Sequence, residues 1–169
     1  YEIIVDSLVE SRIAATNFNL LEEDHSISAL VPYIKYYMPC SKIVPILLHG
    51  SFGLKDAQKL GQNLQEKLEK ENKNGLIIAS VDFSHYLPLE KAEQMDEISI
   101  KAIENRDMNI IQHFNNDYMD SPTSIITLLS AMDTAGAEHM KVLDHSNSDI
   151  IVGSRSSETT SYFTVVFLE

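Results

Sequence analysis

The sequence has little cysteine. Its one cysteine, Cys40, excludes an internal disulfide and a zinc site built from several cysteines. A single thiol fits a reducing cytosol, so we expect a cytoplasmic protein. Cys40 could be a nucleophile or a small core or loop residue, and we favour the second role because it is the commoner one.

Basic charge and long apolar runs are also scarce. The 13 basic residues face 25 acidic ones, which gives a formal net charge of −12. Nucleic acids and anionic membranes are bound mainly through Lys and Arg, so we expect neither as a partner. No run approaches the roughly 20 apolar residues that cross a bilayer. The first residues show no basic segment followed by an apolar one, and the chain opens with Tyr1, so we expect it to be part of a longer protein.

What the sequence does have is an ordinary apolar content of 44% over 169 residues, enough for one domain spanning 1–169. Apolar spacing predicts helices over 1–16, 27–37, 57–72, 90–105 and 122–135, and strands over 43–49, 76–86, 140–145 and 162–168. Strands that alternate with helices favour an α/β fold with parallel pairing and crossover connections. Asp96, in the middle of one predicted helix, is expected to be exposed, with the alternative that it turns toward the site.

The stretch 76–86 changes from apolar to polar within a few residues. Its apolar start is typical of a strand buried on both faces, and its end carries Asp82 and His85. Ligands of open α/β sheets bind at the carboxyl ends of strands, where these two side chains could face one crevice. In the alternative interpretation Asp82 caps a turn and His85 lies on the surface.

Two further residues stand at helix starts. His25 precedes the predicted helix 27–37, where it could point at a site or hydrogen-bond locally. Asp120 precedes Ser121 and Pro122, so Asp120 or Ser121 is expected to cap the helix that follows.

Four segments spread along nearly the whole chain form one pattern. They are Glu23-Asp24-His25-Ser26-Ile27, Val44-Pro45-Ile46-Leu47, Ala79-Ser80-Val81-Asp82-Phe83-Ser84-His85-Tyr86 and Asp144-His145-Ser146. In this order they resemble the Memo family, also called AmmeMemoRadiSam system protein B. The third is the most specific, since it resembles the family signature Ser-Ser-Asp-Phe-Ser-His-Tyr. The chain is thereby expected to be the larger, C-terminal part of a Memo-like domain.

The resemblance implies a fold similar to class III extradiol dioxygenases, a three-layer α/β/α sandwich around a mostly parallel or mixed central sheet. It also implies a metal-type pocket at the strand ends. His85 matches the acid/base position of the dioxygenase relatives. Asp82 would orient His85 or bind the substrate, and His25 would line the same pocket. The expected ligand is a small molecule or a peptide.

The chain departs from the family pattern in its metal ligands. The two N-terminal His motifs are absent, and Asp120-Ser121 stands where the family has Cys-Gly. Two imidazoles and one carboxylate form the ligand set of non-haem iron oxygenases, so Asp120 could complete an iron site in the full-length protein. In the alternative, Asp120 is only a helix cap, and this fragment holds no metal.

Two functions follow from the resemblance. The first is a metal-dependent oxidoreductase acting on a small aromatic or redox-active substrate. The alternative is a non-catalytic peptide- or protein-binding module on a vestigial dioxygenase fold. Under either, the fragment alone is expected to be inactive, and an unpaired sheet edge is expected to promote its self-association. We predict that His25, Asp82, His85 and Asp120 converge on one crevice.

Overall fold

The computed structural model describes residues 2–71, 75–154 and 157–168. The chain forms two compact units, residues 1–50 and residues 51–169. The expectation that 1–169 is one domain stays a prediction. None of the helices in the described ranges is long and apolar enough to cross a membrane.

The first unit is made of short helices. These are α1 (Glu2–Glu10), α2 (Phe18–Glu23), α3 (His25–Ser28) and α4 (Val31–Tyr37). The predicted helix 27–37 is therefore two helices. Asp24 caps α3 by accepting hydrogen bonds from the Ile27 amide at 3.0 Å and the Ser26 hydroxyl at 2.5 Å. Pro32 lies in the first turn of α4, where its missing N–H costs nothing.

The strand predicted over 43–49 is wrong, because these residues form no β-strand. An apolar run this short does not distinguish a strand from other packed chain. Pro45 within it also lacks the N–H that a ladder needs.

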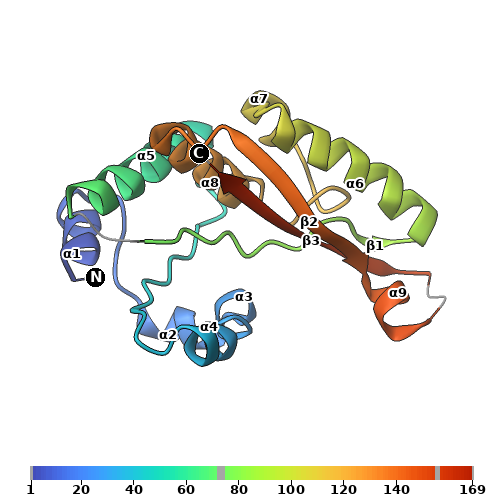
Figure 1. Cartoon of the computed structure of the whole chain (residues 1–169), viewed down its shortest axis with the longest axis horizontal. Helices are drawn as coiled ribbons and strands as arrows, with labels where there is room; N and C mark the ends of the chain where they lie inside the picture. Colours follow the sequence, from blue (N-terminus) through green and yellow to red (C-terminus); the bar gives the residue numbers. More distant parts are fainter. Residues whose placement is uncertain (1, 72–74, 155–156, 169) are drawn as a thin grey trace. The chain divides into compact units, whose positions relative to one another are not determined.

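The second unit contains the helices α5 (Leu54–Lys70), α6 (Leu89–Glu104), α7 (Met108–Ile111), α8 (Pro122–Ala135) and α9 (Ser148–Val152). α5 and α8 pack side by side (Figure 1). Their close approach depends on Gly61 of α5. A Cβ atom there would lie 2.2 Å from the Thr127 carbonyl oxygen and 2.9 Å from the Ala131 amide nitrogen of α8.

The sheet of the second unit consists of β1 (His85–Leu87), β2 (His139–Asn147) and β3 (Thr159–Leu168) in the order β1-β3-β2. The α/β class is confirmed. Both strand pairs are antiparallel, which differs from the expected parallel pairing. β2 and β3 are joined by 148–158, too short a connection for the crossover that parallel neighbours require. β2 is an edge strand of the described sheet, and self-association through it stays a prediction.

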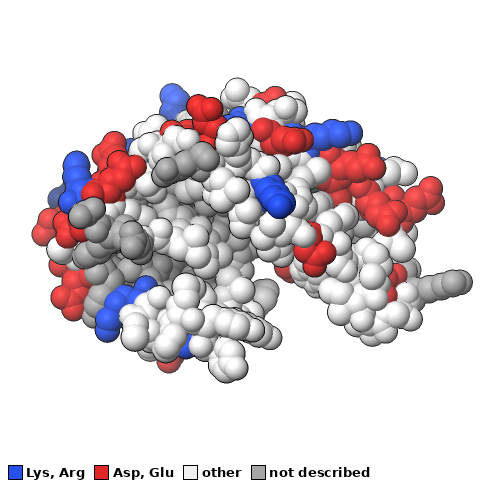
Figure 2. Space-filling model, viewed as in Figure 1, with Lys and Arg blue, Asp and Glu red and all other residues white. Residues whose placement is uncertain are grey.

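The core of the second unit lies between one face of the sheet and the helices. Phe163, Phe167 and Met140 of the sheet pack against buried residues of α5, α6, α7 and α8. Charged side chains of both signs cover α5, and acidic side chains gather over α6 (Figure 2). The Lys- and Glu-rich face of α5 is therefore a solvated surface.

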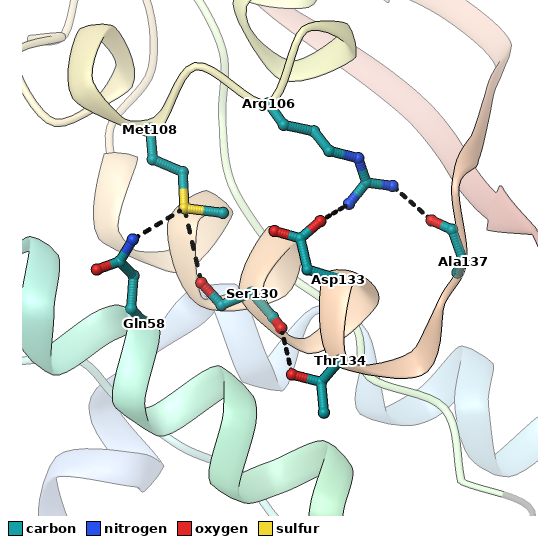
Figure 3. A network of polar contacts seen from close by, with 7 residues as sticks. All are labelled: Gln58, Arg106, Met108, Ser130, Asp133, Thr134 and Ala137. Carbon is teal, nitrogen blue, oxygen red and sulfur yellow. Dashed lines mark hydrogen bonds and ion pairs between the residues drawn. The ribbon is translucent and has the colours of Figure 1, made fainter.

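Arg106 joins the end of α6 to the end of α8. Its guanidinium donates to the Asp133 carboxylate and to the Ala137 carbonyl (Figure 3). The guanidinium carbon also lies 5.6 Å from the centre of the Phe167 ring. A planar fork of donors suits two acceptors at once, which a lysine ammonium would not match.

Met108 of α7 holds α5 and α8 together through its sulfur. Gln58 Nε2 of α5 lies 3.5 Å from this sulfur and Ser130 Oγ of α8 lies 3.7 Å from it (Figure 3). Together with the Arg106 contacts, this fixes α8 within the unit. Asp120, two residues before α8 begins, is fixed with it.

Candidate functional site: a carboxylate pair beside a buried histidine

Residues 82–84 run between two other chain segments. On one side the Phe83 amide donates to the Ser161 carbonyl at 3.0 Å, and the Ser161 amide donates to the Ser84 carbonyl at 2.8 Å. On the other side Phe83 forms an antiparallel bridge with Met119, and the Asp120 amide donates to the Asp82 carbonyl at 3.0 Å. The strand predicted over 76–86 is wrong for most of its length, because residues 76–84 form no strand apart from the isolated bridge at Phe83, and β1 begins only at His85. Leu76 and Ile78 are 72% and 49% exposed, so the apolar run is not buried on both faces. The polar end of this stretch is held by backbone hydrogen bonds on both sides.

Side-chain alternation places Asp82 and Asp120 together. Phe83 and Met119 are 5% and 0% exposed and point into the core, so the preceding and following residues point to the opposite face. Asp82 is half-buried there and Asp120 is exposed. Tyr162, 40% exposed, follows Ser161 on the neighbouring strand β3. Together with Asp82 and Asp120 it forms a row of polar side chains on this face.

The charges of this row affect one another. Partial burial of the Asp120 carboxyl raises its pKa, the negative charge of Asp82 raises it further, and His85 acts in the opposite direction. Burial of the Tyr162 hydroxyl raises its pKa above the ordinary value, and Asp82 adds to the increase. Asp82 is thus close enough to act on both neighbours, and Asp120 is close enough to respond to His85.

His85 is nearly buried, with 8% of its surface exposed, so its interpretation as a surface residue is wrong. Its backbone amide donates to the Asn116 carbonyl at 3.2 Å, and its ring atom Nδ1 lies 2.8 Å from the Phe83 carbonyl oxygen. A carbonyl oxygen only accepts, so the hydrogen sits on Nδ1. In the neutral ring Nε2 then carries the lone pair and is the basic atom.

Tyr86, next to His85, has a left-handed backbone with φ of 61°. A residue with a Cβ atom pays about 1–2 kcal/mol for this conformation. The Tyr86 ring is 69% exposed and meets the His85 ring edge-on, with centroids 4.8 Å apart. Such strain is typical of functional sites, where surrounding contacts hold a residue in place.

The structure brings together three of the four predicted site residues, Asp82, His85 and Asp120. Their catalytic and metal-ligand roles stay predictions. Asp120 is not the cap of α8, because the N-cap position is Ser121. His25, exposed at the start of α3, belongs to the first unit, and its convergence with the others stays a prediction.

Sequence reasoning missed Tyr162 and a second histidine–carboxylate pair. Asp96 is 1% exposed, so of the two interpretations of this residue the exposed one is wrong, and its Oδ2 lies 2.8 Å from Nε2 of His145. Helical spacing in the sequence indicated that Asp96 is buried, because it falls on the stripe of α6 formed by the buried Ala92, Ser99 and Ile103. For Tyr162, alternation with buried neighbours on β3 placed it on the opposite face from the core.

The residues of this site do not make a complete metal centre. Across 2–71, 75–154 and 157–168, no three His, Cys, Asp or Glu side chains are grouped so that they could hold a metal ion. The metal-ligand role of Asp120 therefore needs ligands beyond these residues, and we derive no chemical step through a metal.

The fold and the site define an α/β protein that places a buried histidine beside two carboxylates. The family model described as Memo-like protein matches residues 3–166, and the chain belongs to this family.

Relatives in archaea and bacteria are called MEMO1 family proteins. The chain is 30% identical to that of Methanobrevibacter smithii over 92% of its own length and 56% of the relative. It is 34% identical to that of Methanococcus vannielii over 75% of the chain and 46% of the relative. The chain is 30% identical to the relative from Aquifex aeolicus, over 86% of the chain and 54% of the relative. The chain thus spans about half the length of the relatives it matches.

Proposed function

We propose that this chain supplies the acid–base part of a dioxygenase-like pocket, in which His85 accepts a proton from the hydroxyl of a small aromatic substrate. The observation that carries the proposal is the 2.8 Å contact between His85 Nδ1 and the Phe83 carbonyl. It commits the hydrogen to Nδ1 and leaves Nε2 as the proton acceptor of the neutral ring.

The proton balance is simple. The phenolic O–H bond breaks, Nε2 gains the proton, and His85 becomes an imidazolium with a hydrogen on each nitrogen. The negative charge of Asp120 is close enough to His85 for each to affect the other, and it would stabilise this cation. Asp82 lies beside Asp120 and adds negative charge to the same face.

Oxidation of such a substrate would need a redox-active group that the described residues do not hold. The oxidoreductase activity is therefore a proposal for the whole protein, and proton transfer is the share that we assign to this chain. A metal held by Asp120 and ligands from elsewhere would supply the oxidising chemistry when bound.

A phenol with a coloured phenolate tests the proposal. The intact protein is mixed with 4-nitrophenol at a pH below the pKa of the free probe, and the absorbance of the bound phenolate is measured. We expect the wild type to increase the ionised fraction of the bound probe and His85→Gln to lose this increase. His113→Gln, which changes an exposed histidine after α7, serves as the control and should behave like the wild type.

Two outcomes would overturn the proposal. Equal ionisation of the probe by the wild type and His85→Gln would show that another group takes the proton. Absence of binding, or binding without ionisation, by the wild type would favour the alternative, a non-catalytic peptide- or protein-binding module.

A further inference from the structure

The pair formed by Asp96 and His145 links α6 to β2 inside the second unit. The Asp96 carboxyl is 1% exposed, and its Oδ2 lies 2.8 Å from His145 Nε2. Its other oxygen, Oδ1, is buried and has no hydrogen-bond partner among the described residues. A buried carboxylate is costly unless it is paired, so the contact with His145 is a strong restraint on the ring.

The restrained ring of His145 lies flat on a core aromatic. The His145 and Phe163 rings are parallel to within 1°, with centroids 4.0 Å apart. Phe163 in turn meets Phe83 edge-to-face, with centroids 4.6 Å apart and planes at 66°. Such pairs have defined geometry, so a change in the first ring alters the packing of the next.

The third contact is the hydrogen bond between the His85 ring and the Phe83 backbone, which sets the tautomer of His85. Phe83 is 5% exposed, and its carbonyl oxygen accepts the hydrogen on His85 Nδ1 at 2.8 Å. The Phe83 ring and its backbone carbonyl belong to one residue, so a displacement of the ring is transmitted to the backbone that carries the carbonyl. A continuous set of contacts therefore runs from the buried carboxylate to His85.

We propose that Asp96 and His145 are positioning residues for His85, acting through the stacked rings of Phe163 and Phe83. This inference rests on the proposed function, because it gives His85 its tautomer and hence its basic Nε2. The competing explanation is that the pair only fastens α6 to the sheet, in which case its loss lowers stability and leaves His85 unchanged.

The tautomer of His85 distinguishes these explanations. It is measured in the intact protein from the ¹⁵N chemical shifts of the two ring nitrogens, which differ between the protonated and the bare atom. His145→Gln is the main variant, because the glutamine amide can still donate to Asp96 while the ring stack on Phe163 is lost. Asp96→Asn is the second variant, since it keeps the shape and removes the charge.

We expect wild-type His85 to hold its hydrogen on Nδ1 and both variants to shift to a mixture of tautomers. Ser99→Ala is the matched control. Ser99 is also buried on α6, but its hydroxyl donates to the Tyr118 carbonyl at 3.3 Å and takes no part in the ring contacts. This control should keep the Nδ1–H form even if it unfolds more easily.

The inference is overturned if folded His145→Gln and Asp96→Asn keep the wild-type tautomer, or if Ser99→Ala shifts it as much as they do. The 4-nitrophenol measurement separates this failure from failure of the function. A wild type that ionises the probe, beside variants with an unchanged tautomer, rejects the positioning role alone. A wild type that does not ionise it rejects the function of His85, whatever the tautomer in the variants.

Discussion

The backbone amide of Asp120 donates a 3.0 Å hydrogen bond to the carbonyl oxygen of Asp82, and this contact brings two carboxylates from distant parts of the chain together. Burial of the Asp120 carboxyl raises its pKa, and the negative charge of Asp82 raises it further.

Replacing Asp82 by Asn tests this coupling directly. We expect the pKa values of Asp120 and Tyr162 to fall, because the variant removes a negative charge that raises both. Neither should return fully to its ordinary value, since burial is the larger cause in each case. Carbon-13 NMR titration of the carboxyl and phenol carbons gives both values. Glu93→Gln, an exposed neutralisation on α6, is the control, and equal shifts in this variant would refute the assignment to Asp82.

Replacing Asp120 by Asn should stabilise the protein at neutral pH. The folded-state pKa of Asp120 is raised, so its ionised form is disfavoured in the fold and the penalty is present above that pKa. The gain should be at most about 1 kcal/mol, because the carboxyl is only partly buried and water still screens its charge. It should disappear below the unfolded-state pKa of about 4, where the wild type is protonated in both states. Urea unfolding at several pH values measures the difference, and a gain that persists in acid would contradict this explanation.

Backbone strain at Tyr86 predicts an unusual order of stability. With φ of 61°, Tyr86→Gly should be more stable than Tyr86→Ala by about 1 kcal/mol, because only the alanine has a Cβ atom in the left-handed region. At Ile98, an exposed position within α6, the same two substitutions should rank in the reverse order by about 1 kcal/mol. Chemical denaturation of all four variants checks the prediction, and the same order at both positions would refute it.

Gly61→Ala should weaken the contact between α5 and α8. The new Cβ atom would lie 2.2 Å from the Thr127 carbonyl oxygen, a backbone atom that cannot rotate away. We expect a loss of about 1–3 kcal/mol in the free energy of unfolding, as for other overpacked interiors. Gly50→Ala is the control, since a Cβ atom there meets nothing within 4 Å. A fully stable Gly61→Ala would show that the two helices can separate without cost.

The chain's local signals were sufficient for several of its helices and for the polar stretch of the site. The helical periods of α5, α6 and α8 and the change from apolar to polar at Asp82 are properties of neighbouring residues, so they can be read from the sequence. The parallel pairing was wrong because pairing depends on which segments meet, and the strand over 43–49 was wrong because a short apolar run does not specify a partner.

By itself, the sequence determined that this is an acidic α/β protein of the Memo type, with Asp82, His85 and Asp120 as its chemically notable residues. Only the tertiary structure decided that the two carboxylates share one face, that His85 is buried on the Phe83 carbonyl, and that Asp96 is paired with His145. The physical reason is the separation of the residues along the sequence. Helix and turn preferences act over a few neighbouring residues, whereas these contacts join distant segments that only the folded core brings together.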